Sequence, residues 1–111
     1  MSDKLAVILA NGNTKEPEMG LTYTRNVAKH GWMNDMKLFL FGPSEVTIAT
    51  DPELQKTVKE AISEGTTPQA CKRCSDKYNV SKLLTEIGCN VEYIGAPISE
   101  AVCEGYIPMV W

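Results

Sequence analysis

The chain has 111 residues, of which 43% are hydrophobic, and a formal net charge of −3. A chain of this length forms one domain, and folding buries about 65% of the surface that the unfolded chain exposes. The weakly acidic balance, with no basic run longer than two residues, argues against a nucleic-acid footprint or a membrane-surface patch. We therefore expect no nucleic acid and no membrane among the partners, but proteins or small molecules.

The first apolar run covers residues 5–10, which is too short for a signal-peptide core with its cleavage site and far too short to span a bilayer. This pattern favours a cytoplasmic location. In a reducing compartment the four cysteines are more often free, metal-bound or catalytic than joined in a disulfide framework.

The first half of the chain predicts a strand, a helix and a second strand. Residues 5–10 form a continuous apolar run closed by the turn at 11–13, which is typical of a buried strand. Apolar residues at helical spacing indicate a helix over about 17–30, ended by Gly31. The second apolar run, 36–41, is expected to pair parallel to the first strand.

The middle of the chain predicts a helix, a weak strand and a short helix. Proline at position 52 suits a first helical turn, and either Thr50 or Asp51 can cap it. Residues 66–70 are the weakest element, because Pro68 cannot donate to a sheet ladder and argues against a long central strand. Residues 71–78 have the length of two helical turns.

The last third predicts two short helices and two strands. Helices are expected over 81–88 and 99–104, each with its first serine as N-cap, and strands over 90–94 and 107–111. The alternation of strands and helices predicts an α/β fold, with a single domain over 1–111. We expect a three-layer sandwich, with a mostly parallel sheet of about five strands and helices on both faces.

The segment Cys71-Lys72-Arg73-Cys74 places two thiols around two cations. A spacing of three residues puts both sulfurs on one side of a helical turn. Nearby positive charge and a helix N-terminus favour the thiolate, which is the nucleophilic form. Cys71 at a strand-to-helix junction is therefore the candidate catalytic thiol, supported by Lys72 and Arg73. Cys74 either resolves an oxidised or persulfidated Cys71 or packs as a small hydrophobe.

With its elements in this order, the chain resembles the DsrE/DsrF-like family, which includes the YchN-like proteins and the TusD-type sulfur-relay subunits. The likeness rests on the opening strand and turn at 5–12, the Cys-x-x-Cys segment at 70–80 and the closing helix at 99–106. It implies that Cys71 carries persulfide sulfur and that Cys74 is the second cysteine of the YchN-like subset. It also implies a homotrimer or homohexamer that works with sulfur donor and acceptor proteins.

The turn Asn11-Gly12 belongs to the same expected site. The carboxyl ends of parallel strands meet at one edge of a sheet, where ligands bind, so we expect Asn11 and Gly12 to lie on the edge that carries Cys71. The chain departs from the family pattern at Asn79, where glycine is usual, and at Pro68, within the strand that leads to the cysteine.

The other two cysteines are interpreted as structural. Cys89 follows a glycine at the start of a strand, a position typical of core, and Cys103 lies near acidic residues that raise a thiol pKa. A zinc site built from all four cysteines is poorly spaced, because Cys89 and Cys103 fall on different elements. His30 at a helix C-terminus is expected either to serve as a favourable charge or simply to face solvent, and we expect no metal ligands and no cofactor.

Two other functions stay open beside a sulfurtransferase or persulfide carrier. A non-catalytic oligomeric binding module of the same fold would use its cysteines only for packing. A dithiol redox protein would use the Cys-x-x-Cys pair, but here the motif follows the third strand, unlike the thioredoxin arrangement.

Overall fold

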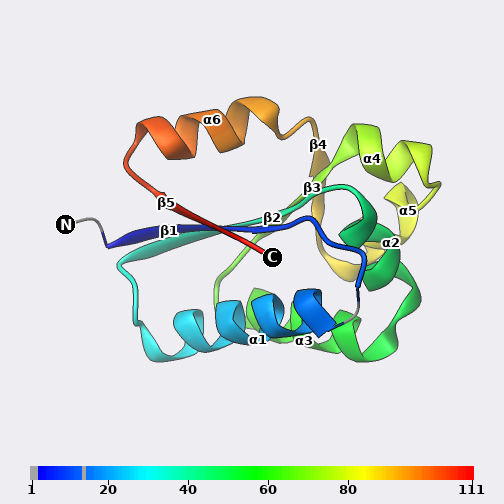
Figure 1. The fold of residues 1–111 in the computed structure, drawn as a ribbon. Helices are drawn as coiled ribbons and strands as arrows, with labels where there is room; N and C mark the ends of the chain where they lie inside the picture. Colours follow the sequence, from blue (N-terminus) through cyan, green and yellow to red (C-terminus); the bar gives the residue numbers. More distant parts are fainter. Residues whose placement is uncertain (1–2, 14) are drawn as a thin grey trace.

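The computed structural model describes residues 3–13 and 15–111, so Met1, Ser2 and Thr14, which belong to the predicted domain, lie outside the described residues. The chain forms an α/β sandwich around a five-stranded parallel sheet with the order β4-β3-β2-β1-β5 (Figure 1). This confirms the predicted fold class. The strands are β1 (Lys4–Leu9), β2 (Asp35–Leu40), β3 (Pro68–Cys71), β4 (Asn90–Glu92) and β5 (Ile107–Val110).

Helices cover both faces of the sheet. They are α1 (Lys15–His30), α2 (Pro43–Thr50), α3 (Pro52–Ser63), α4 (Lys72–Lys77), α5 (Ser81–Ile87) and α6 (Gly95–Cys103). In Figure 1, α1 and α3 lie below the sheet, and α4 and α6 lie above it. Within residues 3–13 and 15–111, no helix has both the length and the apolar content that crossing a bilayer requires.

The two faces of the sheet carry separate hydrophobic clusters. Alternate residues of β1 divide between them: Leu5, Val7 and Leu9 join the larger cluster with α1 and α3, whereas Ala6 joins the smaller one with Phe39 of β2. Strands buried on both faces have continuous apolar runs, which is why β1 lacks the alternation of a half-exposed strand. Cys71 belongs to the smaller cluster, on the face that α6 covers.

Strand β3 is short but central, between β2 and β4. Pro68 is its first residue and lies in register with Leu38 of β2. Proline is tolerated at the first position of a strand, so the ring limits the length of β3 without displacing it from the sheet.

Helix α2 was not predicted, because residues 43–50 were assigned to no element. It begins after Gly42, whose φ of 67° and ψ of −138° suit glycine, and Pro43 occupies the first turn. Asp51 then ends α2 and caps α3, with its Oδ1 accepting hydrogen bonds from the backbone N–H groups of Glu53 and Leu54. Of the two caps considered, Asp51 is therefore correct.

The two predicted serine caps are wrong. Ser81 does not cap α5; its Oγ lies 2.5 Å from Asp76 Oδ1 and 2.7 Å from Ser75 Oγ, which ties α5 to α4. Ser99 lies inside α6, where its hydroxyl donates to the carbonyl of Gly95, because α6 begins earlier than predicted. A serine whose hydroxyl hydrogen-bonds to another group does not cap the backbone N–H groups at the start of its helix.

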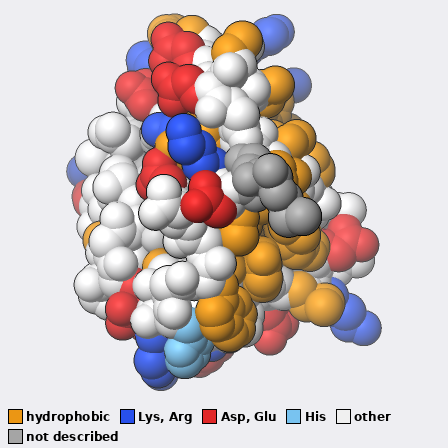
Figure 2. Space-filling view, turned by 90° about the vertical axis from the view of Figure 1, so that its left-hand side faces the viewer, with side chains coloured by type: hydrophobic (Ala, Val, Ile, Leu, Met, Phe, Trp, Pro, Cys, Tyr) orange, Lys and Arg blue, Asp and Glu red, His pale blue; other side chains and the backbone are white. Residues whose placement is uncertain are grey.

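Strand β5 forms an edge of the sheet, and its side chains Ile107, Met109 and Val110 are exposed. Figure 2 shows hydrophobic side chains gathered in a band on one side of the face drawn, next to the imidazole of His30, the single histidine of the chain. Exposed Trp32 stacks on this imidazole, with 5.1 Å between the ring centroids. His30 faces solvent as predicted.

Candidate functional site

The candidate site lies where β2 and β3 end. Cys71 is the last residue of β3 and the N-cap residue of α4, and Cys74 follows within α4. Glu45 comes from the first turn of α2, directly after β2. Because β2 and β3 are parallel neighbours, their carboxyl ends bring the two segments together across 26 residues of sequence (71 − 45 = 26).

The three side chains form a compact cluster. One carboxylate oxygen of Glu45 and the sulfurs of Cys71 and Cys74 all lie within 4.8 Å of one another. The Glu45 residue is fully buried, Cys71 is 8% exposed, and Cys74 is partly exposed. The prediction that Cys71 sits at a strand-to-helix junction is confirmed, but it is far less exposed than an open strand end suggests.

Glu45 is an unusual residue for such a place. Neither carboxyl oxygen has a hydrogen-bond partner among the described residues. Burial raises the pKa of Glu45 to about 8, and the nearby backbone amide of Cys71 offsets this only in part. Glu45 was not predicted as a site residue because helix α2 itself was not predicted. The sequence feature that could have indicated Glu45 is an acidic residue shortly after a buried strand and a Gly-Pro pair.

The surroundings of Cys74 favour the neutral thiol over the thiolate. Burial raises the pKa of the Cys74 thiol, and the Cys71 side chain and the Glu45 charge add to this effect. The backbone amide of Gly42 acts in the opposite direction. The Cys74 thiol therefore interacts with both the Cys71 side chain and the Glu45 carboxyl group.

The two cations of the motif differ in position. The Lys72 ammonium lies 2.9 Å from Asp76 Oδ2, one turn further along α4, so it pairs with a carboxylate. Support from Lys72 for the Cys71 thiolate is therefore weaker than predicted. Arg73 instead lines a pocket together with the cysteines. Helix α4 has only six residues, so its dipole is small and side-chain cations supply most of the positive charge.

This cysteine pocket has a volume of about 190 Å³. Phe41 and Tyr78, both about two-fifths exposed, form apolar walls, and the Lys77 ammonium lies 5.8 Å from the centre of the Tyr78 ring. The complete lining is Phe41, Cys71, Arg73, Cys74, Lys77 and Tyr78. A small pocket with two thiols and two cations is suited to a small anion or to the thiol of a partner.

Asn11 and Gly12 lie on the predicted edge of the sheet but not in the cysteine pocket. The backbone N–H of Asn11 donates to the carbonyl of Trp111, and the Gly12 carbonyl accepts a hydrogen bond from Thr47 in α2. This is where the strand order reverses, between β1 and β5. Gly12 is tied to α2 and Asn11 to the backbone of Trp111, and neither lines the cysteine pocket.

The remaining cysteines lie outside the cluster. Cys89 is 4% exposed in the larger hydrophobic cluster, and burial raises its pKa to about 12, which confirms the structural role. Cys103 was interpreted as structural, but it is exposed at the end of α6, so the structure gives no support for a packing role. All four cysteines are free.

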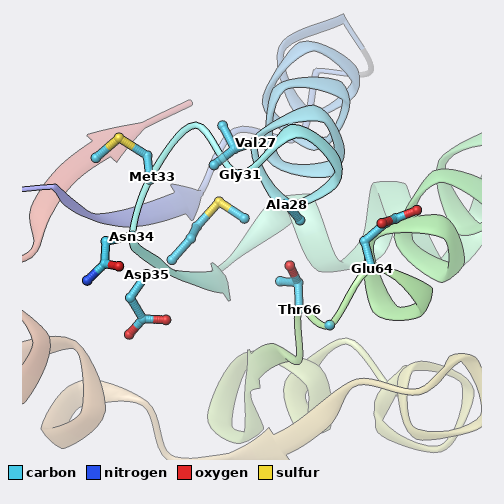
Figure 3. Close-up of a pocket in the computed structure, with 10 residues that line it drawn as sticks. Val27, Ala28, Gly31, Met33, Asn34, Asp35, Glu64 and Thr66 are labelled. Atoms are coloured by element: carbon cyan, nitrogen blue, oxygen red, sulfur yellow. The ribbon is translucent and has the colours of Figure 1, made fainter.

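A second pocket, also of about 190 Å³, lies at the opposite edge, near the amino ends of β2 and β3. Figure 3 shows the carboxylates of Asp35 and Glu64 pointing away from each other there, so they do not converge on one ligand. Asp35 already accepts a hydrogen bond from the Tyr106 hydroxyl. The nucleophilic side chains are at the carboxyl edge instead.

Comparisons with known proteins identify a fold but no activity. No family model matches the chain, and no curated protein matches it. The structure is similar to a solved structure of a conserved protein of unknown function from Bacteroides thetaiotaomicron, with a TM-score of 0.90 and 27% sequence identity. The match covers 98% of this chain and 95% of that one, so the whole architecture is shared.

Proposed function

We propose that this protein carries sulfane sulfur as a persulfide on Cys71 and passes it to a protein acceptor, with Cys74 controlling its release. The observation that supports this most directly is the pair of free, mutually close thiols in a small pocket that also contains Arg73 and Lys77. A sulfur carrier needs a thiolate that a donor can reach and a charge environment that accepts an anion.

The chemistry balances without a cofactor. The Cys71 thiolate attacks the outer sulfur of a donor persulfide, forming a Cys71 persulfide and releasing the donor's thiolate. An acceptor thiolate then attacks the outer sulfur of the Cys71 persulfide, takes it over and regenerates the Cys71 thiolate. Alternatively, Cys74 attacks the inner sulfur, forms a Cys71–Cys74 disulfide and releases hydrosulfide; an external thiol must then reduce the disulfide.

The pocket favours sulfur in anionic form. A persulfide is more acidic than a thiol and leaves Cys71 with a negative charge, and the guanidinium of Arg73 and the ammonium of Lys77 lie in the same lining. The apolar walls formed by Phe41 and Tyr78 exclude part of the water that would screen this attraction. The Cys71 sulfur is shielded enough to delay loss of the persulfide to solvent thiols.

We further propose, from the resemblance of residues 70–80 to the Cys-x-x-Cys segment of the DsrE/DsrF-like proteins, that the chain belongs with them. On this proposal it works in the cytoplasm, forms a homotrimer or homohexamer, and exchanges sulfur with donor and acceptor proteins. The four free thiols are consistent with a reducing compartment.

The experiment is mass spectrometry of the full chain after incubation with a cysteine desulfurase and cysteine, or with a sulfurtransferase and thiosulfate, in the presence of a metal chelator. We expect one added sulfur atom on wild type and none on Cys71→Ser. Cys74→Ser should keep the added sulfur longer, because the internal release by disulfide formation is removed.

Cys103→Ser is the matched control, because Cys103 is the most exposed of the cysteines but lies outside the pocket. Sulfur loading that depends on Cys103 and not on Cys71 would show only the reactivity of an exposed thiol. Absence of loading on wild type would contradict the proposal and favour the non-catalytic binding module.

A further inference from the structure

We propose that Glu45, Cys71 and Cys74 form a zinc site, with two thiolates and one carboxylate as ligands and a fourth position open toward the cysteine pocket. This site goes beyond the proposed sulfur-carrier function and does not require it. It also differs from a zinc site made of the four cysteines, because neither Cys89 nor Cys103 takes part.

The geometry is close to what zinc requires. Bonds of about 2.3 Å to sulfur and about 2.0 Å to oxygen in a tetrahedral arrangement place ligand atoms about 3.5–3.8 Å apart. The three donor atoms already lie within 4.8 Å of one another, so each pair has to close by no more than about 1.3 Å. We expect rotations of the three side chains to supply this approach.

The carboxylate is independent evidence for a cation. A charged group in an apolar interior is costly unless it is paired or coordinates a metal. Glu45 is completely buried, and neither of its oxygens has a hydrogen-bond partner among the described residues. A metal ion bound beside the two thiolates would satisfy this carboxylate, whereas among the described residues only the backbone amide of Cys71 offsets its burial, and only in part.

The mixture of ligands selects the metal. Thiolates disfavour Mg²⁺ and Ca²⁺, which prefer oxygen ligands only, while a carboxylate disfavours Cu(I), which prefers soft sulfur. Zn²⁺ accepts both ligand types in one tetrahedral site. The three ligands carry three negative charges against two on zinc, and the excess is balanced by Arg73 and Lys77 in the pocket lining.

Binding involves no oxidation or reduction. Zinc–sulfur and zinc–oxygen bonds form as the S–H and O–H bonds of any protonated ligand break, and the protons pass to the buffer. The metal and a persulfide use the same sulfurs, so a zinc-loaded chain is blocked as a sulfur acceptor until the metal leaves. Zinc would then regulate the proposed sulfur chemistry.

The test is a titration of the reduced, chelator-stripped full chain with Zn²⁺ against a chromophoric zinc indicator, together with Co²⁺ substitution and absorption spectroscopy. All variants are made in a Cys103→Ser background, which removes the exposed thiol. We expect one Zn²⁺ per chain and a thiolate-to-cobalt charge-transfer band. Loss of a single ligand, in Cys71→Ser, Cys74→Ser or Glu45→Gln, should weaken binding at least about 100-fold, since outer-shell changes alone cost about 10- to 100-fold.

Cys89→Ala is the matched control and should leave the zinc affinity unchanged, because Cys89 is buried but lies outside the cluster. Glu45→Met provides a second, apolar variant of similar size, and near-ultraviolet circular dichroism checks that each variant is folded. Undiminished affinity in both Glu45 variants would overturn the proposal, as would affinity that depends on Cys89. Because sulfur loading is measured with a chelator, zinc binding and persulfide formation can each fail separately.

Discussion

At the scale of single residues, the site is defined by a carboxyl group that sequence reasoning did not select. A carboxylate oxygen of Glu45 lies within 4.8 Å of the sulfurs of Cys71 and Cys74. The charge of Glu45 also raises the pKa of the Cys74 and Cys89 thiols. A buried carboxyl group without a partner destabilises a fold whenever it is ionised. Its presence beside two free thiols is therefore the strongest local sign of a functional site.

Glu45 makes the stability of the metal-free protein depend on pH. Its pKa is about 8 in the folded chain against an ordinary value of 4.5, so between these values the folded state holds a proton that the unfolded chain has released. Stability from this group is fully present below pH 4.5 and is lost as the pH rises toward 8. At about 1.4 kcal/mol per pKa unit, the loss is about 5 kcal/mol.

Urea denaturation in the presence of a chelator, at several pH values across this window, measures the effect. The difference in unfolding free energy between Glu45→Gln and wild type should grow as the pH rises, in favour of the variant. Glu60→Gln is the control, because Glu60 is partly exposed and pairs with Arg25 across 3.3 Å at the surface. A constant difference between Glu45→Gln and wild type would contradict the assignment.

At the scale of elements, two short segments that follow neighbouring strands build the site. Gly42 follows the end of β2 at Leu40, precedes α2 as its N-cap residue, and directs its amide toward the Cys74 sulfur. Ser81 holds α5 against α4 through Ser75 and Asp76, and Asn79 makes the turn between them with a φ of 59°. Asparagine tolerates this left-handed conformation, which explains how the turn forms without the glycine expected there.

Gly42→Ala should therefore disturb both stability and the site. With a φ of 67° and a ψ of −138°, position 42 is strained for any residue with a Cβ atom, and the substitution should cost about 1–3 kcal/mol. Urea denaturation measures the cost, and alkylation of Cys74 should change in rate as α2 shifts. Gly95→Ala is the control, since Gly95 has ordinary φ and open space at its Cβ position. Equal effects of the two substitutions would show that the conformation of Gly42 is not required.

At the scale of the whole molecule, the sheet leaves one apolar edge uncovered. Strand β5 pairs with β1 only, and Val110 is 65% exposed on it. Exposed apolar side chains that lie together mark protein interfaces more often than scattered ones do. This edge is a suitable contact for the self-association that we propose on the basis of the family resemblance.

Substitution of a residue on the exposed β5 edge should lower the mass of the proposed oligomer. Val110→Lys places a charge where an interface would be apolar, so multi-angle light scattering should show a lower mass than for wild type. Leu83→Lys, on α5 beside the opposite edge of the sheet, is the matched control and should keep the wild-type mass. A monomeric wild type, or an oligomer unaffected by Val110→Lys, would count against this interface.

The predictable part of the fold consists of elements whose local pattern and tertiary environment agree. Strand β1, helix α1 and strand β2 carry strong apolar periodicity, and all three were predicted within about two residues. The Ser81 cap was wrong because Ser81 bonds to α4, a contact that local sequence does not encode, and the Ser99 cap was wrong because α6 begins at Gly95. Helix α2 was not predicted from the sequence because it has little apolar periodicity. It forms instead because Gly42 and Pro43 begin it and Ile48 is buried.

Local sequence patterns are enough to predict a small α/β domain and to place Cys71 and Cys74 one helical turn apart after the third strand. Both conclusions depend on residues close together in the chain, where spacing and turn chemistry act directly. The position of Glu45 beside the two thiols, the pairing of Lys72 with Asp76 and the place of Cys103 outside the cluster emerge only once the chain is folded. Those outcomes depend on which strands are neighbours in the sheet and on what each helix buries, and both are set by packing of the whole chain.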